Sequence, residues 1–172
     1  MAEAQIVGWA HSRFGKSEAA STLELMAEVV PPALAHAGLG AADVDAIFVG
    51  VFNNGFSAQD FQASLVAMGT PDLAHTPATR LENACATGSA AIHAALDFIG
   101  AGRGRVALVV GAEKMTAVPT AETGDILLGA SYRKEEAEIE GGFAGVFGLL
   151  RPPGGVPSEA AAGAVLRAID GA

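Results

Sequence analysis

The sequence predicts an α/β fold, a mostly parallel sheet with covering helices built in the order β-α-β-α-β-α-β. Apolar runs of strand length alternate along the chain with segments whose apolar residues recur at helical spacing. Strands that alternate with helices in this way form parallel sheets. Gly and Ala are frequent and aromatic residues make up only 6% of the 172 residues, which favours helices packed closely on a sheet over an aromatic-rich β-sandwich.

Four strands and three connecting helices account for most of the first 115 residues. The expected strands are Gln5–Ala10, Val44–Val51, Ala78–Glu82 and Arg105–Gly111. The expected helices are Leu23–Leu34, Asp60–Met68 and Cys85–Ile99. Ser21 and Glu24 form a capping box before the first helix, Gly38 ends it, and Pro31-Pro32 should break or kink it midway.

The chain changes in character after this region. Residues Thr116–Gly129 are expected to be irregular, and a charged stretch and a short apolar stretch follow up to residue 150. Residues 151–172 form a tail rich in Pro, Gly and Ala. Ser158 and Glu159 can cap a helix through Ile169, but the tail also reads as a return to a fifth strand at Ala162–Ala168, or as a truncated or frameshifted end.

The composition argues against several classes of function. The formal net charge is −9 and basic residues do not cluster, so no nucleic-acid-binding surface is expected. One cysteine and four scattered histidines give no familiar metal-site spacing. A solitary cysteine fits a reducing compartment, and no signal peptide or membrane-length apolar run is visible. We therefore expect a cytoplasmic chain that holds no metal and binds neither nucleic acid nor membrane.

The segment Glu82–Ser89 is the strongest candidate for a catalytic site. It reads Glu-Asn-Ala-Cys-Ala-Thr-Gly-Ser and joins the third strand to the helix that should begin at Cys85. A thiol at a helix N-terminus meets unsatisfied backbone N–H groups and the positive end of the macrodipole, and the same N–H groups can stabilise an oxyanion. Ala84, Ala86 and Gly88 leave room for a substrate. Cys85 is therefore the candidate nucleophile.

From the residues alone, other interpretations of Cys85 stay open. A lone cysteine is often a small buried hydrophobe. The macrodipole contributes only about 0.3–1 kcal/mol, and the local sequence offers no base, because His93 lies about two helical turns away. A cysteine hydrolase is a weaker interpretation, since the Gly-x-nucleophile-x-Gly elbow is absent.

Weaker signals come from four other places. The segment Gly111–Met115 lies at the carboxyl end of the clearest strand, where ligand sites tend to lie. It can contribute to such a site or simply form a capped loop, and the sequence favours neither. Gly100–Gly104 precedes a strand, the wrong order for a dinucleotide motif, and reads as a helix end and turn. Asp43 and Asp45 have no evident partner. The histidines expected at the surface are His11, His36 and His75.

Taken together, these motifs resemble the thiolase family. The resemblance rests on Glu82–Ser89 followed by Gly111–Thr116, and also on Arg13–Lys16 and Ala37–Leu39. It covers roughly residues 4–148 and is strongest for the branch with the sterol-carrier-protein thiolases and acetyl-CoA acetyltransferases. It implies the N-terminal half of a thiolase-like fold, with residues 1–115 as the core, 116–150 as the start of a loop region and 151–172 as the tail.

The resemblance also implies an activity. Family members form or break a carbon–carbon bond between acyl groups carried on coenzyme A, with no permanently bound cofactor, and Cys85 would take the acyl group as a thioester. It identifies no coenzyme-binding residue. A ketoacyl synthase of the same fold fits the Glu-Lys-Met segment less well.

The family's later motifs, Gly-His-Pro and Cys-x-Gly, which supply a histidine and a second cysteine, do not occur in the 172 residues. We therefore expect that the isolated chain cannot turn over. The alternative is a non-catalytic or partner-dependent subunit. A homo-oligomer or a complex with a partner chain is expected, because the family's dimers join near the strand that precedes the cysteine.

Overall fold

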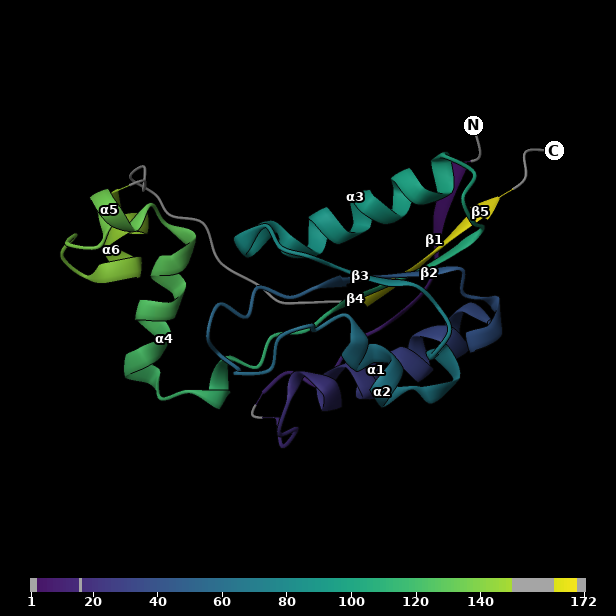
Figure 1. Ribbon diagram of the computed structural model, residues 1–172, viewed down its shortest axis with the longest axis horizontal. Coiled ribbons are helices and arrows are strands. Elements are labelled where there is room, and N and C mark those ends of the chain that lie inside the picture. The colour runs from purple at the N-terminus through teal and green to yellow at the C-terminus, as the bar shows by residue number, and fades with distance from the viewer. Residues whose placement is uncertain (1–2, 16, 150–162, 170–172) are drawn as a thin grey trace. The chain divides into compact units, whose positions relative to one another are not determined.

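The computed structural model describes residues 3–15, 17–149 and 163–169, and Figure 1 shows their helices and strands. The chain forms two compact units. The first contains the described residues of Met1–Phe52, Gln59–Glu113 and Ala161–Ala172, and the second contains those of Asn53–Ala58 and Lys114–Ala160.

A five-stranded sheet runs through the first unit. Its strands are β1 (Glu3–Ala10), β2 (Ala46–Gly50), β3 (Ala78–Leu81), β4 (Val106–Gly111) and β5 (Gly163–Ile169). Their order is β1-β5-β4-β2-β3, and β2 pairs in parallel with β3 and β4. β5 is antiparallel to β1 and to β4, so β1 runs in the same direction as β4. The predicted α/β fold is confirmed, and β5 separates β1 from the parallel strands.

Helices cover both faces of the sheet (Figure 1). α1 (Thr22–Ala37) and α2 (Ser64–Gly69) pack on one face, and α3 (Thr87–Gly100) packs on the other. Strand side chains point alternately to opposite faces, so β4 serves two cores. Val106, Leu108 and Val110 belong to the core beneath α1, while Ala107 and Val109 belong to the core beneath α3.

The start and end of α1 agree with the sequence. Ser21 Oγ accepts a hydrogen bond from the Glu24 N–H, and Glu24 Oε2 accepts one from the Ala20 N–H. Ser21 therefore caps the helix as predicted, but the capping box is incomplete, because Glu24 accepts from the residue before the N-cap and not from the Ser21 N–H. Gly38 ends the helix in the left-handed conformation, with φ 68°.

The predicted break at Pro31 and Pro32 is wrong, because α1 is continuous through both prolines. Both are exposed, so water can reach the carbonyl groups that lose an N–H partner. The buried side of the helix carries Met26, Val30 and Leu34, each at most 5% exposed. Packing of this apolar side outweighs the local cost of the prolines.

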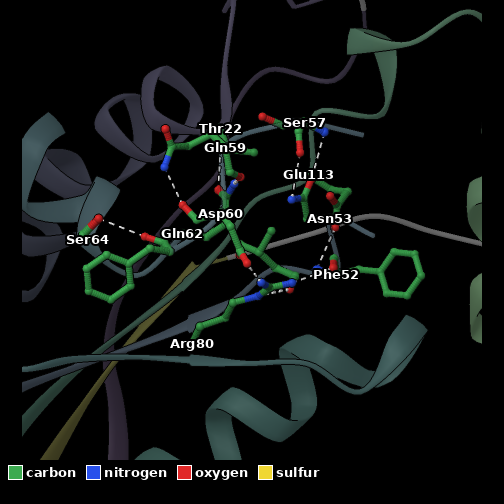
Figure 2. Close-up of polar contacts among 12 residues, drawn as sticks. Thr22, Phe52, Asn53, Ser57, Gln59, Asp60, Gln62, Ser64, Arg80 and Glu113 are labelled. Carbon is green, nitrogen blue, oxygen red and sulfur yellow. Dashed lines mark hydrogen bonds and ion pairs between the residues drawn. The ribbon is translucent and has the colours of Figure 1, made fainter. Parts of the chain in front are cut away.

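Helix α2 is shorter than the predicted Asp60–Met68, and a buried glutamine accounts for the difference. The side chain of Gln62 is fully buried; its Oε1 accepts a hydrogen bond from the Thr22 hydroxyl, and its Nε2 donates to the Gln59 carbonyl (Figure 2). Phe61 has φ 53°, which is incompatible with a right-handed helix. Residues before Ser64 therefore form a loop tied to α1.

The second unit is mainly helical where the structure describes it. It contains α4 (Thr120–Leu127), α5 (Arg133–Glu136) and α6 (Gly142–Leu149). The expectation of irregular structure over Thr116–Gly129 is wrong for α4, which packs against α6. Asn54 Nδ2 donates to the Ile126 carbonyl of α4. These contacts join residues that are far apart in the sequence, so a local sequence pattern cannot predict them.

The tail contributes β5, so the fifth-strand interpretation is correct over Gly163–Ile169 and a helix through Ile169 is wrong. Residues 150–162 lie outside the described part of the chain. Among the described helices, none combines the length and apolar character needed to cross a membrane.

Candidate active site

The carboxyl ends of β2, β3 and β4 lie side by side. Gly50, the last residue of β2, is in register with Leu81 of β3 on one side and with Gly111 of β4 on the other. The segments that begin at Val51, Glu82 and Ala112 therefore leave the sheet at the same end. Ligands of open α/β sheets bind outside the carboxyl ends of the strands, so this end is the place to look for a site.

Cys85 lies in the segment that joins β3 to α3. Ala84–Ala86 form one turn of 3₁₀-helix, and α3 begins at Thr87. The predicted helix over Cys85–Ile99 therefore starts two residues later than expected. Ala84 has φ 46°, a left-handed conformation that costs an L-residue about 1–2 kcal/mol. The sharp turn at Ala84 ends in an exposed thiol, so a buried structural role for Cys85 does not apply.

Thr87 holds this turn together. Its Oγ1 accepts a hydrogen bond from the Asn83 N–H at 2.8 Å and donates one to the Ala84 carbonyl at 2.6 Å. The remaining bonds of the turn run from the Ala84 N–H to Glu82 Oε1 and from the Ala86 N–H to the Asn83 carbonyl. These bonds stabilise the strained turn that precedes the thiol.

Gly50 allows Thr87 to pack on the end of β2. A Cβ added at Gly50 would lie 3.1 Å from Thr87 Cγ2 and 3.2 Å from the Thr87 carbonyl oxygen, closer than side chains normally approach. Thr87 is only 7% exposed. Because residue 50 has no side chain, the first residue of α3 can pack closely against the end of β2.

Arg80 and Glu113 fix the segment that follows β2 (Figure 2). Arg80 Nε donates to the Val51 carbonyl at 3.0 Å and Nη2 donates to the Phe52 carbonyl at 2.7 Å. Glu113 Oε2 accepts a hydrogen bond from the Phe52 N–H at 2.9 Å. Arg80 was not predicted from the sequence, where its only signal is a long cationic side chain inside a short strand.

The second motif of the resemblance is divided between the two units. Gly111, Ala112 and Glu113 belong to the first unit, where Glu113 contacts the segment after β2. Lys114–Thr116 belong to the second unit. The carboxyl end of β4 therefore supplies a residue that supports the neighbouring segment.

The remaining candidates are structural. Gly100 ends α3 and Gly102, with φ 67°, makes the following turn, as predicted. The expectation that Asp43 and Asp45 lack partners is wrong, because Asp43 accepts a hydrogen bond from the Gly40 N–H and Asp45 accepts two from the start of β4.

The histidines lie apart from the turn at Cys85. His93 is exposed on α3. His36 Nδ1 contacts the backbone of Trp9, His11 stacks on Phe14, and His75 is exposed. Within residues 3–15, 17–149 and 163–169, no three His, Cys, Asp or Glu side chains are grouped so as to hold a metal ion.

Comparison with known proteins decides the family. Residues 4–144 match the family described as "Thiolase, N-terminal domain". The chain belongs to the thiolase family. The match contains β1–β4, the turn at Cys85 and the segment after β4, so the resemblance seen in the sequence is confirmed.

Two curated relatives of this thiolase-family chain bear the name acetyl-CoA acetyltransferase. The protein of Methanocaldococcus jannaschii is 33% identical over 151 residues, which are 87% of this chain and 38% of that protein. The protein of Methanothermobacter thermautotrophicus is 32% identical over 119 residues, which are 69% of this chain and 31% of that protein. The chain thus spans about a third of the length of these relatives.

Solved structures support the fold. An acetyl-CoA acetyltransferase from Syntrophomonas wolfei aligns with a TM-score of 0.52 at 19% identity, over 63% of this chain and 28% of that one. A 3-oxoacyl-[acyl-carrier-protein] synthase III from Aquifex aeolicus aligns with a TM-score of 0.51 at 26% identity, over 60% of this chain and 32% of that one.

Proposed function

We propose that this chain is the acyl-accepting part of a thiolase-type acyltransferase and that Cys85 takes an acyl group from a coenzyme A thioester. One observation carries the proposal: an exposed thiol on a strained turn, at the carboxyl end of a parallel sheet and inside the range that matches the family. The names of the two curated relatives support acetyl-CoA as the substrate.

The chemistry is a thioester exchange. The Cys85 sulfur attacks the thioester carbonyl carbon, and the carbonyl oxygen becomes an oxyanion. The bond from that carbon to the coenzyme A sulfur then breaks, and the proton of Cys85 leaves with the coenzyme A thiol. Amide N–H groups at the start of a helix can stabilise an oxyanion, and the turn that carries Cys85 leads directly into α3.

The helix terminus alone does not activate Cys85 fully. The macrodipole at an exposed helix terminus contributes only about 0.3–1 kcal/mol to the stability of a nearby anion. A general base is therefore required for fast acylation. His93 is exposed on α3, eight residues along the chain, and does not fit that role.

We propose further that these 172 residues do not complete the carbon–carbon step on their own. Family members use a second cysteine to move the proton of the attacking acetyl group, and this chain contains one cysteine. The expected behaviour is therefore a single acylation. In the alternative, this chain acts as a subunit, and a partner chain supplies the missing groups.

The edge of the sheet supports an association with a second chain. β3 is the last strand in the order β1-β5-β4-β2-β3, and an edge strand offers unpaired backbone groups to another strand. Size-exclusion chromatography with light scattering should give a dimer or larger species. A monodisperse monomer at high concentration would contradict this part of the proposal.

Release of coenzyme A tests the proposed function. The pure chain is mixed with acetyl-CoA, and free coenzyme A is measured by chromatography. We expect slow release of about one equivalent per chain that ends in a plateau, and no release with Cys85→Ala, which removes the nucleophile. Absence of Cys85-dependent release would contradict acyl acceptance, and sustained Cys85-dependent cleavage of acetoacetyl-CoA would contradict the expected single acylation.

A further inference from the structure

We propose that Thr87 is the positioning residue of Cys85. The inference rests on the proposed function only in that Cys85 is taken as the reacting thiol. Thr87 comes two residues after Cys85, is 7% exposed and does not lie on the exposed surface of the turn. It therefore acts through the backbone of Asn83 and Ala84, which precede Cys85, and not on the substrate.

The hydroxyl of Thr87 closes the turn in both directions. It accepts from the Asn83 N–H at 2.8 Å and donates to the Ala84 carbonyl at 2.6 Å. A hydroxyl can do both at once, because it carries one donor and two acceptor sites. The two bonds bracket Ala84, whose φ of 46° an alanine rarely adopts. Without these two hydrogen bonds, the turn can relax and Cys85 can move away from its position.

The methyl group of Thr87 packs against the end of β2. The added-Cβ distance of 3.1 Å from residue 50 to Thr87 Cγ2 places that methyl against the end of β2. Threonine therefore combines two functions that other side chains separate. Serine keeps the hydroxyl and loses the methyl, whereas valine keeps the shape and loses both hydrogen bonds.

The test compares Thr87→Val with Thr87→Ser. Cys85 is the one cysteine of the chain, so the rate of thiol loss with iodoacetamide reports on this site alone. We expect Thr87→Val to slow alkylation at least three-fold, as the thiol leaves the helix terminus. Acetylation by acetyl-CoA should slow by about ten- to a hundred-fold, since misplacement by an ångström has that effect on a reaction. Thr87→Ser should stay within about two-fold of the unchanged chain in both assays.

Thr70→Val is the matched control. Thr70 Oγ1 is buried without a hydrogen-bond partner among the described residues, so this change of the same size should leave both rates as they are. Far-UV circular dichroism confirms that each variant is folded. If Thr87→Val does not fold, Gly50→Ala replaces it, because the new Cβ pushes on Thr87 Cγ2. Adding Thr87→Ser to Gly50→Ala should then restore part of the alkylation rate.

The outcomes separate this inference from the proposed function. Alkylation that depends on the Thr87 hydroxyl in a chain that acetyl-CoA never acetylates would leave the positioning role intact and refute the acyltransferase. Unchanged alkylation of Thr87→Val, or an equal loss in Thr87→Ser, would overturn the positioning role. The positioning role is also overturned if iodoacetamide alkylates the double variant of Gly50→Ala and Thr87→Ser no faster than it alkylates Gly50→Ala alone.

Discussion

Replacing Arg80 by methionine should destabilise the first unit by about 2–3 kcal/mol. Three hydrogen bonds are lost, two to the carbonyl groups of Val51 and Phe52 and one to Asp60. A hydrogen bond from a charged donor contributes about 1.5–3 kcal/mol when buried. The Arg80 side chain is 27% exposed, so each carbonyl bond is reduced to about 1 kcal/mol by solvent.

The ion pair with Asp60 should contribute little, because the carboxylate side is 79% exposed and exposed pairs are worth about 0–1 kcal/mol. Asp60→Asn is therefore the matched control, with an expected loss below about 1 kcal/mol. Urea unfolding measures the loss in both variants, and at a slope of about 1–3 kcal/mol/M the Arg80→Met midpoint falls by roughly 0.7–3 M. Equal losses for the two variants would refute the reasoning, since the ion pair and not the carbonyl bonds would then stabilise the segment after β2.

Three further substitutions follow from the packing. Thr70→Val should raise the free energy of unfolding by about 1 kcal/mol in urea, because it removes a buried hydroxyl that has no partner among the described residues; a loss of stability would contradict this. Gly8→Ala should lower it by about 1–3 kcal/mol, because the new Cβ meets the Ala33 carbonyl and the Ala37 Cβ at 2.7 Å; an unchanged midpoint would show that β1 can move away from α1. A Cβ added at Gly88 meets no atom within 4 Å, so Gly88→Ala should leave the urea midpoint unchanged. It should slow the acetylation of Cys85 more than its alkylation. Equal effects on the two rates would mean that the acyl group does not approach over Gly88.

β2 and β4 could be predicted because they are continuous apolar runs. β2 and β4 are covered on both faces, and strands in that position read as unbroken apolar segments. The order of the strands could not be predicted. β5 pairs with β1 from the other end of the chain, and no local pattern in Gly163–Ile169 specifies that partner or its direction.

Local rules failed where tertiary contacts compete with them. Pro31 and Pro32 predict an interruption, but the buried side of α1 holds the helix together. Asp60–Met68 has the composition of a helix, but the buried amide of Gln62 binds Thr22 of α1 and keeps its first residues in a loop.

The position of Cys85 could be predicted, whereas the structure of its turn could not. The end of β3 and the start of a helix are visible in the sequence, and they place the cysteine between the two. The left-handed conformation of Ala84 is uncommon for alanine, so no local rule anticipates it or the bonds of Thr87 that depend on it. Arg80 was missed because its carbonyl partners belong to a different strand connection.

The most direct test of the account is the position of the acetyl group after brief exposure to acetyl-CoA. Trypsin cleaves after Arg80 and Arg103, so Cys85 lies in the peptide Leu81–Arg103. Tandem mass spectrometry should find one acetyl group in that peptide, on the sulfur of Cys85, and hydroxylamine should remove it as it does a thioester. An unmodified Leu81–Arg103 peptide, or acetyl groups only on lysines, would contradict the proposal that Cys85 accepts the acyl group.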